Sequence, residues 1–207
     1  MRRTKEEAEQ TRRAIMAAAL RTFDCRGIAK TTLEQIAERA GVTRGAIYHH
    51  FVDKQALLAA IREDVSLPLI DRADFTLLTD RAGDPLERVE RFLLDLFRAI
   101  DEDEALRLAF FVMSFKCEYV GALESELDEY ARKIERTRSQ LTDVYAHAQA
   151  RGDLRACLTP EIAALETTVF LAGLMRLCLL DGRGVGARQH APELIAAHVA
   201  ARRACSA

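Results

Sequence analysis

Residues 32–54 read TLEQIAERAGVTRGAIYHHFVDK, and this stretch decides how the first part of the chain folds. Thr32 with Gln35 three residues later is typical of a capping box, in which each side chain bonds a free backbone N–H at a helix start. The apolar residues that follow recur at helical spacing and predict a buried face: Leu33, Ile36, Ala37 and Ala40. Gly41 supplies the permissive backbone that ends this helix.

A second, shorter helix follows the turn AGVT at residues 40–43. Thr43 can cap it, and it is expected to run from Arg44 to about His50, before Asp53 caps the next helix. Two short helices joined by such a turn, after a longer supporting helix, match the helix-turn-helix pattern. In that pattern the second helix enters the major groove of DNA.

The second helix is too short to serve burial alone, because only Ile47, with Ala46 beside it, must face the core. Arg44 lies near the helix start, where an arginine can reach a guanine edge, and Gly45 and Ala46 are small enough for a close approach to the groove. The outward residues that can hydrogen-bond phosphate oxygens are Thr43, Tyr48, His49 and Lys54. The segment is therefore predicted to bind double-stranded DNA.

His49 and His50 are adjacent, which raises the alternative of a metal or acid–base site. Neighbouring side chains on a helix point about 100° apart, and no third ligand stands nearby in the sequence. A metal site is not expected, and His50 is interpreted as a partly packed residue. Glu34 and Glu38 are expected on the exposed face of the preceding helix, as solvated carboxylates.

Composition sets the broad class of the protein. A chain of 207 residues with 49% hydrophobic residues is long enough for one or two domains with a real core. No run of about 18 uncharged apolar residues is present, so a membrane span is not expected. The charged start MRRTKEEAEQTRR lacks the apolar middle of a signal peptide, and we expect a cytoplasmic protein.

Charge and cysteine content add two further limits. Residues 1–54 carry 11 Lys and Arg against 7 Asp and Glu, whereas the remainder carries 19 against 25. This asymmetry suggests different partners for the two parts. The five cysteines are odd in number, widely spaced and without a CxxC pair, so neither a disulfide framework nor a zinc ribbon is expected.

Glycine and proline are few, and apolar residues recur at helical spacing nearly everywhere, so the chain is predicted to be all-α with about nine helices. Pro68 should end or kink the helix that Asp53 caps. The other helices are expected at about Thr4 or Gln10 to Arg26, 84–100, 104–120, 123–151, 160–181 and 192–203. We divide the chain into a helix-turn-helix domain at 1–54 and a helical ligand-sensing and dimerisation domain at 55–207.

Residues 55–207 hold apolar residues in excess but no catalytic constellation, with no phosphate-binding glycine loop, no HExxH and no serine in a nucleophile elbow. The protein is therefore not expected to be an enzyme, and no cofactor or metal is expected. Aromatic and methionine side chains that line a helix bundle form an adaptable apolar pocket. The candidate ligand-binding residues are Val89, Phe92, Leu93, Leu96, Phe110, Met113, Cys117, Thr168, Leu171 and Met175.

The helix expected at 160–181 is apolar on two faces, which predicts that one face lines the interior and the other meets a partner chain. Gly173 inside it lowers helix stability relative to alanine, and close approach of another helix would explain it. The candidate dimer-interface residues are Phe170, Gly173, Leu174 and Leu177. We expect the helices at 160–181 and 192–203 of each chain to form a four-helix interface.

The stretch TTLEQIAERAGVTRGAIYHHFVDKQALL resembles the DNA-binding domain of the TetR family of bacterial transcriptional regulators, and the resemblance covers roughly residues 10–60. It implies a homodimer whose two second helices enter the major grooves of a palindromic operator. The residues at the family's DNA-contacting positions are Thr32, Thr43, Arg44, Gly45, Tyr48, His49 and Lys54. His49 stands where similar relatives usually carry tryptophan.

Three further stretches resemble the AcrR/TtgR-type repressors of multidrug efflux pumps: GDPLERVERFLLDLF at 83–97, FKCEYVG at 115–121 and FLAGLMRLCLL at 170–180. Together the resemblances span nearly the whole chain. They imply a repressor of an efflux operon of the resistance-nodulation-division type, released from DNA by hydrophobic drugs, and hence a part in antibiotic resistance.

Two other functions stay open from the sequence. The same fold can sense a metabolite, such as a fatty-acyl or aromatic compound, and control a catabolic operon. The alternative of another class is a helical enzyme or small-molecule-binding protein that does not touch DNA. The surface from Arg44 to Lys54 argues against that second alternative.

Overall fold

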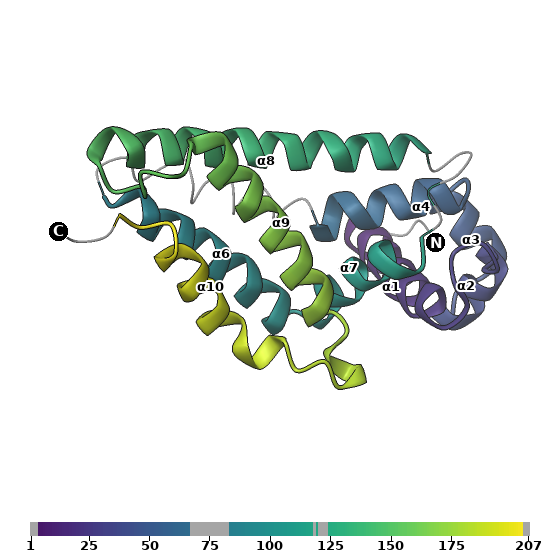
Figure 1. Cartoon of the computed structure of the whole chain (residues 1–207). Coiled ribbons are helices and arrows are strands. Elements are labelled where there is room, and N and C mark those ends of the chain that lie inside the picture. Colours follow the sequence, from purple (N-terminus) through teal and green to yellow (C-terminus); the bar gives the residue numbers. More distant parts are fainter. Residues whose placement is uncertain (1–3, 67–82, 118, 120–123, 205–207) are drawn as a thin grey trace. The chain divides into compact units, whose positions relative to one another are not determined.

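The computed structural model describes residues 4–66, 83–117, 119 and 124–204. Within these ranges the chain forms nine α-helices and no strand, so the predicted all-α class is confirmed (Figure 1). The α-helices are α1 (Lys5–Arg26), α2 (Leu33–Ala40), α3 (Arg44–His50), α4 (Lys54–Ile61), α6 (Pro85–Glu102), α7 (Glu104–Phe115), α8 (Glu124–Arg151), α9 (Pro160–Cys178) and α10 (Ala191–Ala200). Short segments of other helix types are the π-helix η1 (Arg62–Ser66) and the 3₁₀ helices η3 (Asp181–Arg183) and η4 (Arg188–His190).

The helices separate into two compact units. The first contains α1 to α4, η1 and α7, and the second contains α6, nearly all of α8, α9 and α10. The chain leaves the first unit after α4, forms α6 in the second, and returns to the first for α7. A helix from the middle of the sequence therefore completes the N-terminal unit.

Helix starts in the first unit follow from local side chains. Thr32 Oγ1 accepts the backbone N–H of Gln35 at 3.3 Å, and Gln35 Oε1 accepts that of Thr32 at 3.1 Å, which forms the predicted capping box. Thr43 Oγ1 caps α3 by accepting the N–H of Ala46 at 3.1 Å, and Asp53 caps α4 in the same way. The beginnings of α2, α3 and α4 are thus set by the residues that the sequence singles out.

The turn between α2 and α3 is closed by Gly41, whose φ of 67° and ψ of 27° lie in the left-handed region. The N–H of Gly41 donates to the carbonyl of Glu38 at 3.1 Å, and the N–H of Val42 donates to the carbonyl of Ala37 at 3.0 Å. These bonds satisfy carbonyls at the end of α2 and direct the chain into α3.

One apolar core joins the helices of the first unit. Helix α1 packs against both α2 and α7, and its Ile15 and Phe23 are completely buried. Helix α3 adds Ile47 to this core, while α7 adds Ala109 and Val112. The helix-turn-helix is therefore held in place partly by α7, which lies far along the sequence.

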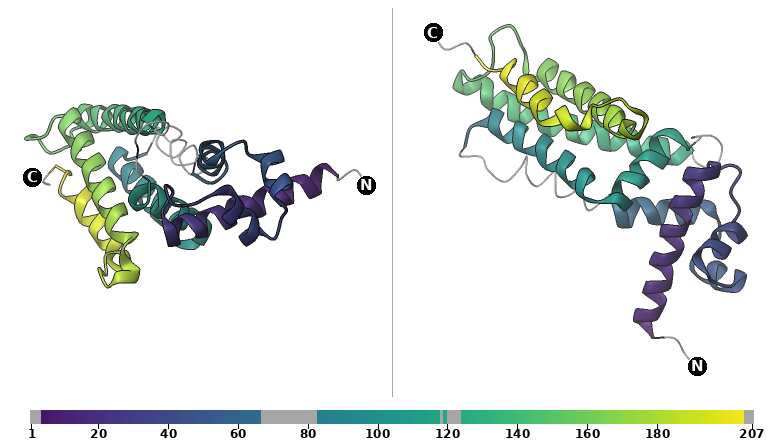
Figure 2. Two further views of the ribbon diagram at one scale, coloured as in Figure 1. Left: turned by 90° about the vertical axis from the view of Figure 1, so that its right-hand side faces the viewer. Right: turned by 90° about the horizontal axis from the view of Figure 1, so that it is seen from below.

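In the second unit, α10 packs against α6 and α9. Figure 2 shows these helices together with the long α8 from two further directions. The buried side chains of this unit include Val89, Phe92, Leu93 and Leu96 of α6, Leu141, Val144 and Tyr145 of α8, and Ile195 and Val199 of α10. The apolar periodicity of α6 thus serves close packing within its own unit.

Helix α10 ends at Ala200 and not near residue 203, and two further helices also end earlier than the sequence predicts. Helix α7 ends at Phe115 and not near residue 120, since the Tyr119 hydroxyl donates to Met113 O at 3.0 Å and so satisfies a carbonyl at the helix end. Helix α9 ends at Cys178 and not near residue 181, and the Asp181 carboxylate accepts two N–H groups of the following loop at 2.7 and 2.8 Å. Near both ends a side chain bonds the backbone several residues away.

The break predicted at Pro68 lies outside the described residues. Before it, α4 continues into the π-helix η1, a segment type that is rare in proteins. Arg12 of α1 forms an ion pair with Asp64 of η1, and its guanidinium lies 5.8 Å from the centroid of the Phe51 ring. The end of α4 is thus tied to α1 within the first unit.

Gly41 and Gly45 offer a matched pair of substitutions. We expect Gly41→Ala to lower the free energy of unfolding by about 1–2 kcal/mol, since an L-residue is strained at this positive φ. Gly45 lies inside α3 without a positive φ, and a Cβ added there meets no atom within 4 Å. Gly45→Ala should therefore raise that free energy by about 0.5–1 kcal/mol. Chemical denaturation measures both, and effects of the same sign would contradict this account of the turn.

Candidate functional site

Helix α3 presents one face to the core of the first unit and the other to solvent. Ile47 is completely buried and Ala46 is half-buried, whereas the remaining candidates at α3 and its cap are exposed: Thr43, Arg44, Gly45, Tyr48 and His49. Thr32 at the cap of α2 is exposed as well. The fold thus leaves the candidate DNA-binding side chains of α3 accessible to a large partner.

Glu34 of α2 contacts two of these candidates. Its Oε1 lies 3.2 Å from Arg44 Nε in an ion pair and accepts the hydroxyl of Tyr48 at 3.1 Å. The Arg44 guanidinium also lies 5.7 Å from the centroid of the Tyr48 ring. The three side chains stay accessible, with 73% of the Arg44 side chain, 44% of the Glu34 side chain and 42% of Tyr48 exposed. The sequence predicts that Glu34 is a solvated carboxylate. Glu34 is exposed, but it also contacts Arg44 and Tyr48, which the sequence does not predict.

The pKa of Glu34 is lowered from its ordinary value. The largest cause is the hydrogen bond to its own backbone N–H at the start of α2, and the Tyr48 hydroxyl is the next. Desolvation is the third effect in size and raises this pKa, and Thr32 and the positive charge of Arg44 lower it again. Glu34 is therefore ionised at neutral pH and places a negative charge beside Arg44.

Lys54 is held by the backbone of the first unit. The sequence predicts a phosphate contact for it, and in the structure its ammonium donates to Ile28 O at 2.8 Å and to Ala29 O at 3.1 Å. Both carbonyls lie in the loop between α1 and α2, so Lys54 ties the start of α4 to that loop. An ammonium carries three N–H donors, and these two bonds leave one donor for a further acceptor.

The candidate ligand-binding residues are divided between the two units. Those in the second unit are buried on α6 or half-buried on α9: Val89, Phe92, Leu93, Leu96, Thr168, Leu171 and Met175. Those in the first unit are half-buried on α7 or just after it: Phe110, Met113 and Cys117. Met113 and Cys117 pack against the core of the first unit. The role of these residues in ligand contact stays a prediction.

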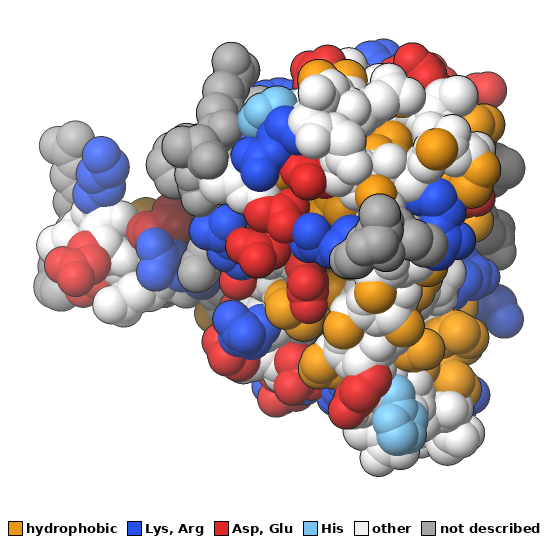
Figure 3. All heavy atoms as spheres, turned by 60° about the vertical axis from the view of Figure 1, so that its left-hand side comes forward, with side chains coloured by type: hydrophobic (Ala, Val, Ile, Leu, Met, Phe, Trp, Pro, Cys, Tyr) orange, Lys and Arg blue, Asp and Glu red, His pale blue; other side chains and the backbone are white. Residues whose placement is uncertain are grey.

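The outer face of α9 carries an apolar stripe, which we define as Ile162, Leu165, Val169, Gly173 and Leu177, all exposed at helical spacing. Val169 is the most exposed of its large side chains, at 64%. Figure 3 shows one face of the molecule, on which hydrophobic side chains gather among acidic and basic ones. The candidate interface residues Gly173 and Leu177 belong to the stripe, whereas Leu174 is buried within the chain and Phe170 stacks on the His198 ring at 3.9 Å.

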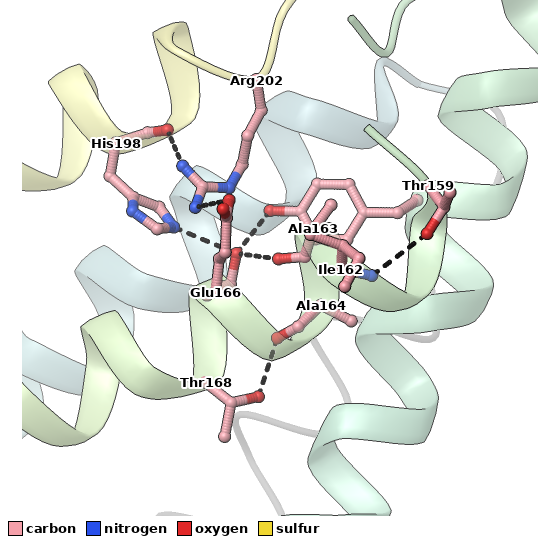
Figure 4. Close-up of polar contacts among 10 residues, drawn as sticks. Thr159, Ile162, Ala163, Ala164, Glu166, Thr168, His198 and Arg202 are labelled. Carbon is pink, nitrogen blue, oxygen red and sulfur yellow. Dashed lines mark hydrogen bonds and ion pairs between the residues drawn. The ribbon is translucent and has the colours of Figure 1, made fainter. Parts of the chain in front are cut away.

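A buried polar cluster joins α8, α9 and α10 (Figure 4). Thr167 Oγ1 lies 2.7 Å from the Tyr145 hydroxyl and 3.0 Å from His198 Nε2, and it donates to Ala163 O at 2.8 Å. A carbonyl oxygen only accepts, so the single hydroxyl proton of Thr167 goes to Ala163. Tyr145 and His198 must then both donate to Thr167, which places the proton of a neutral His198 on Nε2.

Arg202 closes this cluster on the side of α10. It donates to His198 O at 2.6 Å and to Glu166 Oε2 at 2.9 Å. The pKa of His198 is lowered to about 4, mainly by burial and secondly by the positive charge of Arg202. His198 is therefore neutral at physiological pH, which agrees with its assignment as a donor to Thr167.

The described residues contain neither a candidate metal site nor a candidate membrane-spanning helix. No group of three or more His, Cys, Asp and Glu side chains there is placed to hold a metal ion. The rings of His49 and His50 meet edge to face with their centroids 5.4 Å apart. Over the same part of the chain, no helix combines the length and hydropathy that crossing a bilayer requires.

Known families and one curated relative match the chain. Residues 15–61 match the family described as bacterial regulatory proteins, tetR family, and residues 84–202 match the C-terminal region of MAATS-type transcriptional repressors. The HTH-type transcriptional regulator TtgR of Pseudomonas putida is 36% identical over 180 residues, which are 87% of this chain and 85% of TtgR. The similarity therefore extends over both units.

Two solved structures are similar throughout. NalD, the secondary repressor of the MexAB-OprM multidrug efflux pump in Pseudomonas aeruginosa, is 28% identical with a TM-score of 0.81, over 96% of this chain and 98% of NalD. A complex of SmeT with triclosan is 28% identical with a TM-score of 0.77, over 94% of this chain and 92% of SmeT. SmeT is the repressor of the Stenotrophomonas maltophilia multidrug efflux pump SmeDEF.

His198 makes stability depend on pH in a defined direction. Its folded pKa of about 4 lies below the ordinary value of 6.5, so the unfolded chain takes up the proton first as the pH falls. The stability that the neutral ring supplies is complete above about pH 6.5 and is lost as the pH falls toward about 4. Because His198 is only partly buried, we expect a loss of about 1–2 kcal/mol from this residue.

The variant His198→Gln isolates this effect, because an amide can donate to Thr167 but does not titrate in this range. Between about pH 7.5 and pH 5 the melting temperature of the wild type should fall more than that of the variant. Parallel pH profiles for the two proteins would show that His198 does not carry the dependence.

Proposed function

We propose, from the premise that this chain belongs to the TetR family of bacterial regulatory proteins, that it is a ligand-responsive transcriptional repressor. It binds a palindromic operator as a dimer and leaves the DNA when a hydrophobic small molecule binds its helical bundle. We assign DNA contact to residues 1–54 and sensing and dimerisation to residues 55–207. Bacterial DNA lies in the cytoplasm, so we place the protein there.

The exposed face of α3 is the observation that carries the proposal. Arg44 is the first residue of α3 and leaves most of its side chain accessible, so its guanidinium can offer two donors to a guanine edge. Gly45 beside it adds no bulk, which permits close approach to the groove floor. Thr43 and Tyr48 flank this position with hydroxyl groups that suit phosphate oxygens.

Pairing of two chains through α9 and α10 accounts for the apolar stripe. Large contiguous apolar patches on a protein surface mark interaction sites. A Cβ added at Gly173 meets no atom of the chain within 4 Å, so close approach within the chain does not explain this glycine. A helix of a second copy, related by a two-fold axis, would approach it there and would place two α3 helices on the halves of a palindrome.

The relatives suggest which genes the protein controls and which ligands it binds. NalD is a repressor of a multidrug efflux pump, and SmeT has been solved with triclosan. We infer that this chain controls an efflux operon of the resistance-nodulation-division type. A bound drug would favour a conformer in which the two α3 helices are wrongly spaced for DNA, which requires a different drug affinity in the two conformers.

Titration of duplex DNA tests the assignment of α3. On DNA from the region upstream of the protein's own gene, Arg44→Ala should weaken binding by about 1–3 kcal/mol, the usual value of a specific arginine–guanine contact. Arg98→Ala is the matched control, because it removes the same charge from the exposed surface of α6. If the two variants bind the duplex with equal affinity, α3 is not the helix that contacts the bases.

Added triclosan tests the sensor claim on the same complex. We expect it to raise the apparent dissociation constant of the wild-type protein for this duplex. A complex that neither triclosan nor other apolar drugs release would refute drug sensing and leave DNA binding intact. Release by a fatty-acyl or aromatic metabolite in their place would favour control of a catabolic operon.

Val169→Glu tests the dimer interface, because it places a charge on the apolar stripe. We expect analytical ultracentrifugation to find monomers at concentrations where the wild type is dimeric, with weaker DNA binding at equal chain concentration. Leu127→Glu is the control, since Leu127 is an exposed leucine on α8 outside the stripe. A Val169→Glu protein that remains dimeric would exclude the stripe as the interface.

A further inference from the structure

A carboxylate stands on the surface where the proposed function needs hydrogen-bond donors. Glu34 lies on α2, 3.2 Å from Arg44 Nε and 3.1 Å from the Tyr48 hydroxyl. DNA phosphates are anionic, so a negative charge at this place opposes the approach of the backbone of any duplex. Glu34 therefore weakens the general attraction of this surface to DNA.

Glu34 also holds the side chain of Arg44 in position. The ion pair is made at Nε, and a guanidinium has four further N–H donors on its terminal nitrogens. The ring of Tyr48, one turn along α3, supports the same guanidinium at 5.7 Å. Arg44 can therefore keep its contact with Glu34 while its terminal nitrogens meet the edge of a guanine.

For Tyr48, the contact with Glu34 hinders binding to DNA phosphate. A phenol has one proton, and Tyr48 gives it to Glu34. A phosphate oxygen only accepts hydrogen bonds, so Tyr48 can donate to phosphate only after it leaves Glu34. Contact with phosphate therefore competes with an existing bond, whereas contact between Arg44 and a base does not.

We propose that Glu34 is a specificity-determining residue of the DNA-binding surface, an inference that rests on the proposed function. It positions Arg44 for base contact and competes with phosphates for Tyr48. Binding to DNA of unrelated sequence depends almost entirely on phosphate contacts, whereas operator binding adds contacts to bases. Glu34 therefore weakens binding to unrelated DNA more than it weakens binding to the operator.

The test compares Glu34→Gln with Glu38→Gln in the full-length protein. Both variants remove one negative charge from α2, and Glu38 forms neither the ion pair with Arg44 nor the hydrogen bond with Tyr48. Each is titrated against a duplex that the wild-type protein enriches from a random pool, and against a shuffled duplex of the same composition. A single cooperative thermal transition in each variant verifies that it is folded.

Glu34→Gln should tighten binding to the shuffled duplex about two- to fivefold and change binding to the enriched duplex less, so that the ratio of affinities falls. Glu38→Gln should shift both affinities alike and leave the ratio unchanged. In a Tyr48→Phe background the effect of Glu34→Gln on the shuffled duplex should shrink, because no hydroxyl remains to be released.

A measurement without DNA examines the positioning itself. Nitrogen-15 relaxation at Arg44 Nε should show a more mobile side chain in Glu34→Gln and an unchanged one in Glu38→Gln. If the affinity ratio is the same in both variants while Arg44→Ala still lowers it, Glu34 has no part in specificity and the proposed function stands. If the wild type enriches no duplex, DNA recognition itself is wrong and the inference about Glu34 falls with it.

Discussion

The exposed face of α3, which we propose as the DNA-binding surface, depends first on the burial of one side chain, Ile47. Helix α3 has seven residues, and Ile47 is the one that the core covers completely. A helix of this length is not stable alone in water. Its position is therefore set by the Thr43 cap, by the left-handed turn at Gly41 and by the core that receives Ile47. Because α7 supplies part of that core, the surface of α3 also depends on a helix from the middle of the chain.

The boundaries of the helix-turn-helix could be predicted because their causes are local. The capping box at Thr32, the cap at Thr43 and the glycine turn each need only residues within a few positions of one another. The contacts of Glu34 and Lys54 could not be predicted in this way. Glu34 meets Tyr48 from another helix, and Lys54 bonds a loop that precedes it by more than twenty positions. Such contacts depend on the angles at which helices pack, and a single sequence does not contain those angles.

The same reason limits what the apolar pattern of α9 predicts. Helical spacing indicates which residues share a face, but the identity of the covering neighbour comes from the fold. Phe170 and Leu174 look suited to an interface, yet Phe170 stacks on His198 of α10 and Leu174 is buried within the chain. The residues left outside, such as Ile162 and Val169, lie on the exposed side of the same helix. A prediction of interface residues that selects the largest apolar side chains therefore tends to select residues of the chain's own interior.

The apolar stripe of α9 has a consequence for how such a regulator responds to its own abundance. Suppose that only the dimer binds the operator. Well below the dimer dissociation constant, the concentration of dimer is then proportional to the square of the chain concentration. Halving the number of chains in a cell would leave about a quarter of the pairs. Exposed valine and leucine side chains on one helix would then convert a small change in gene expression into a steep change in operator occupancy.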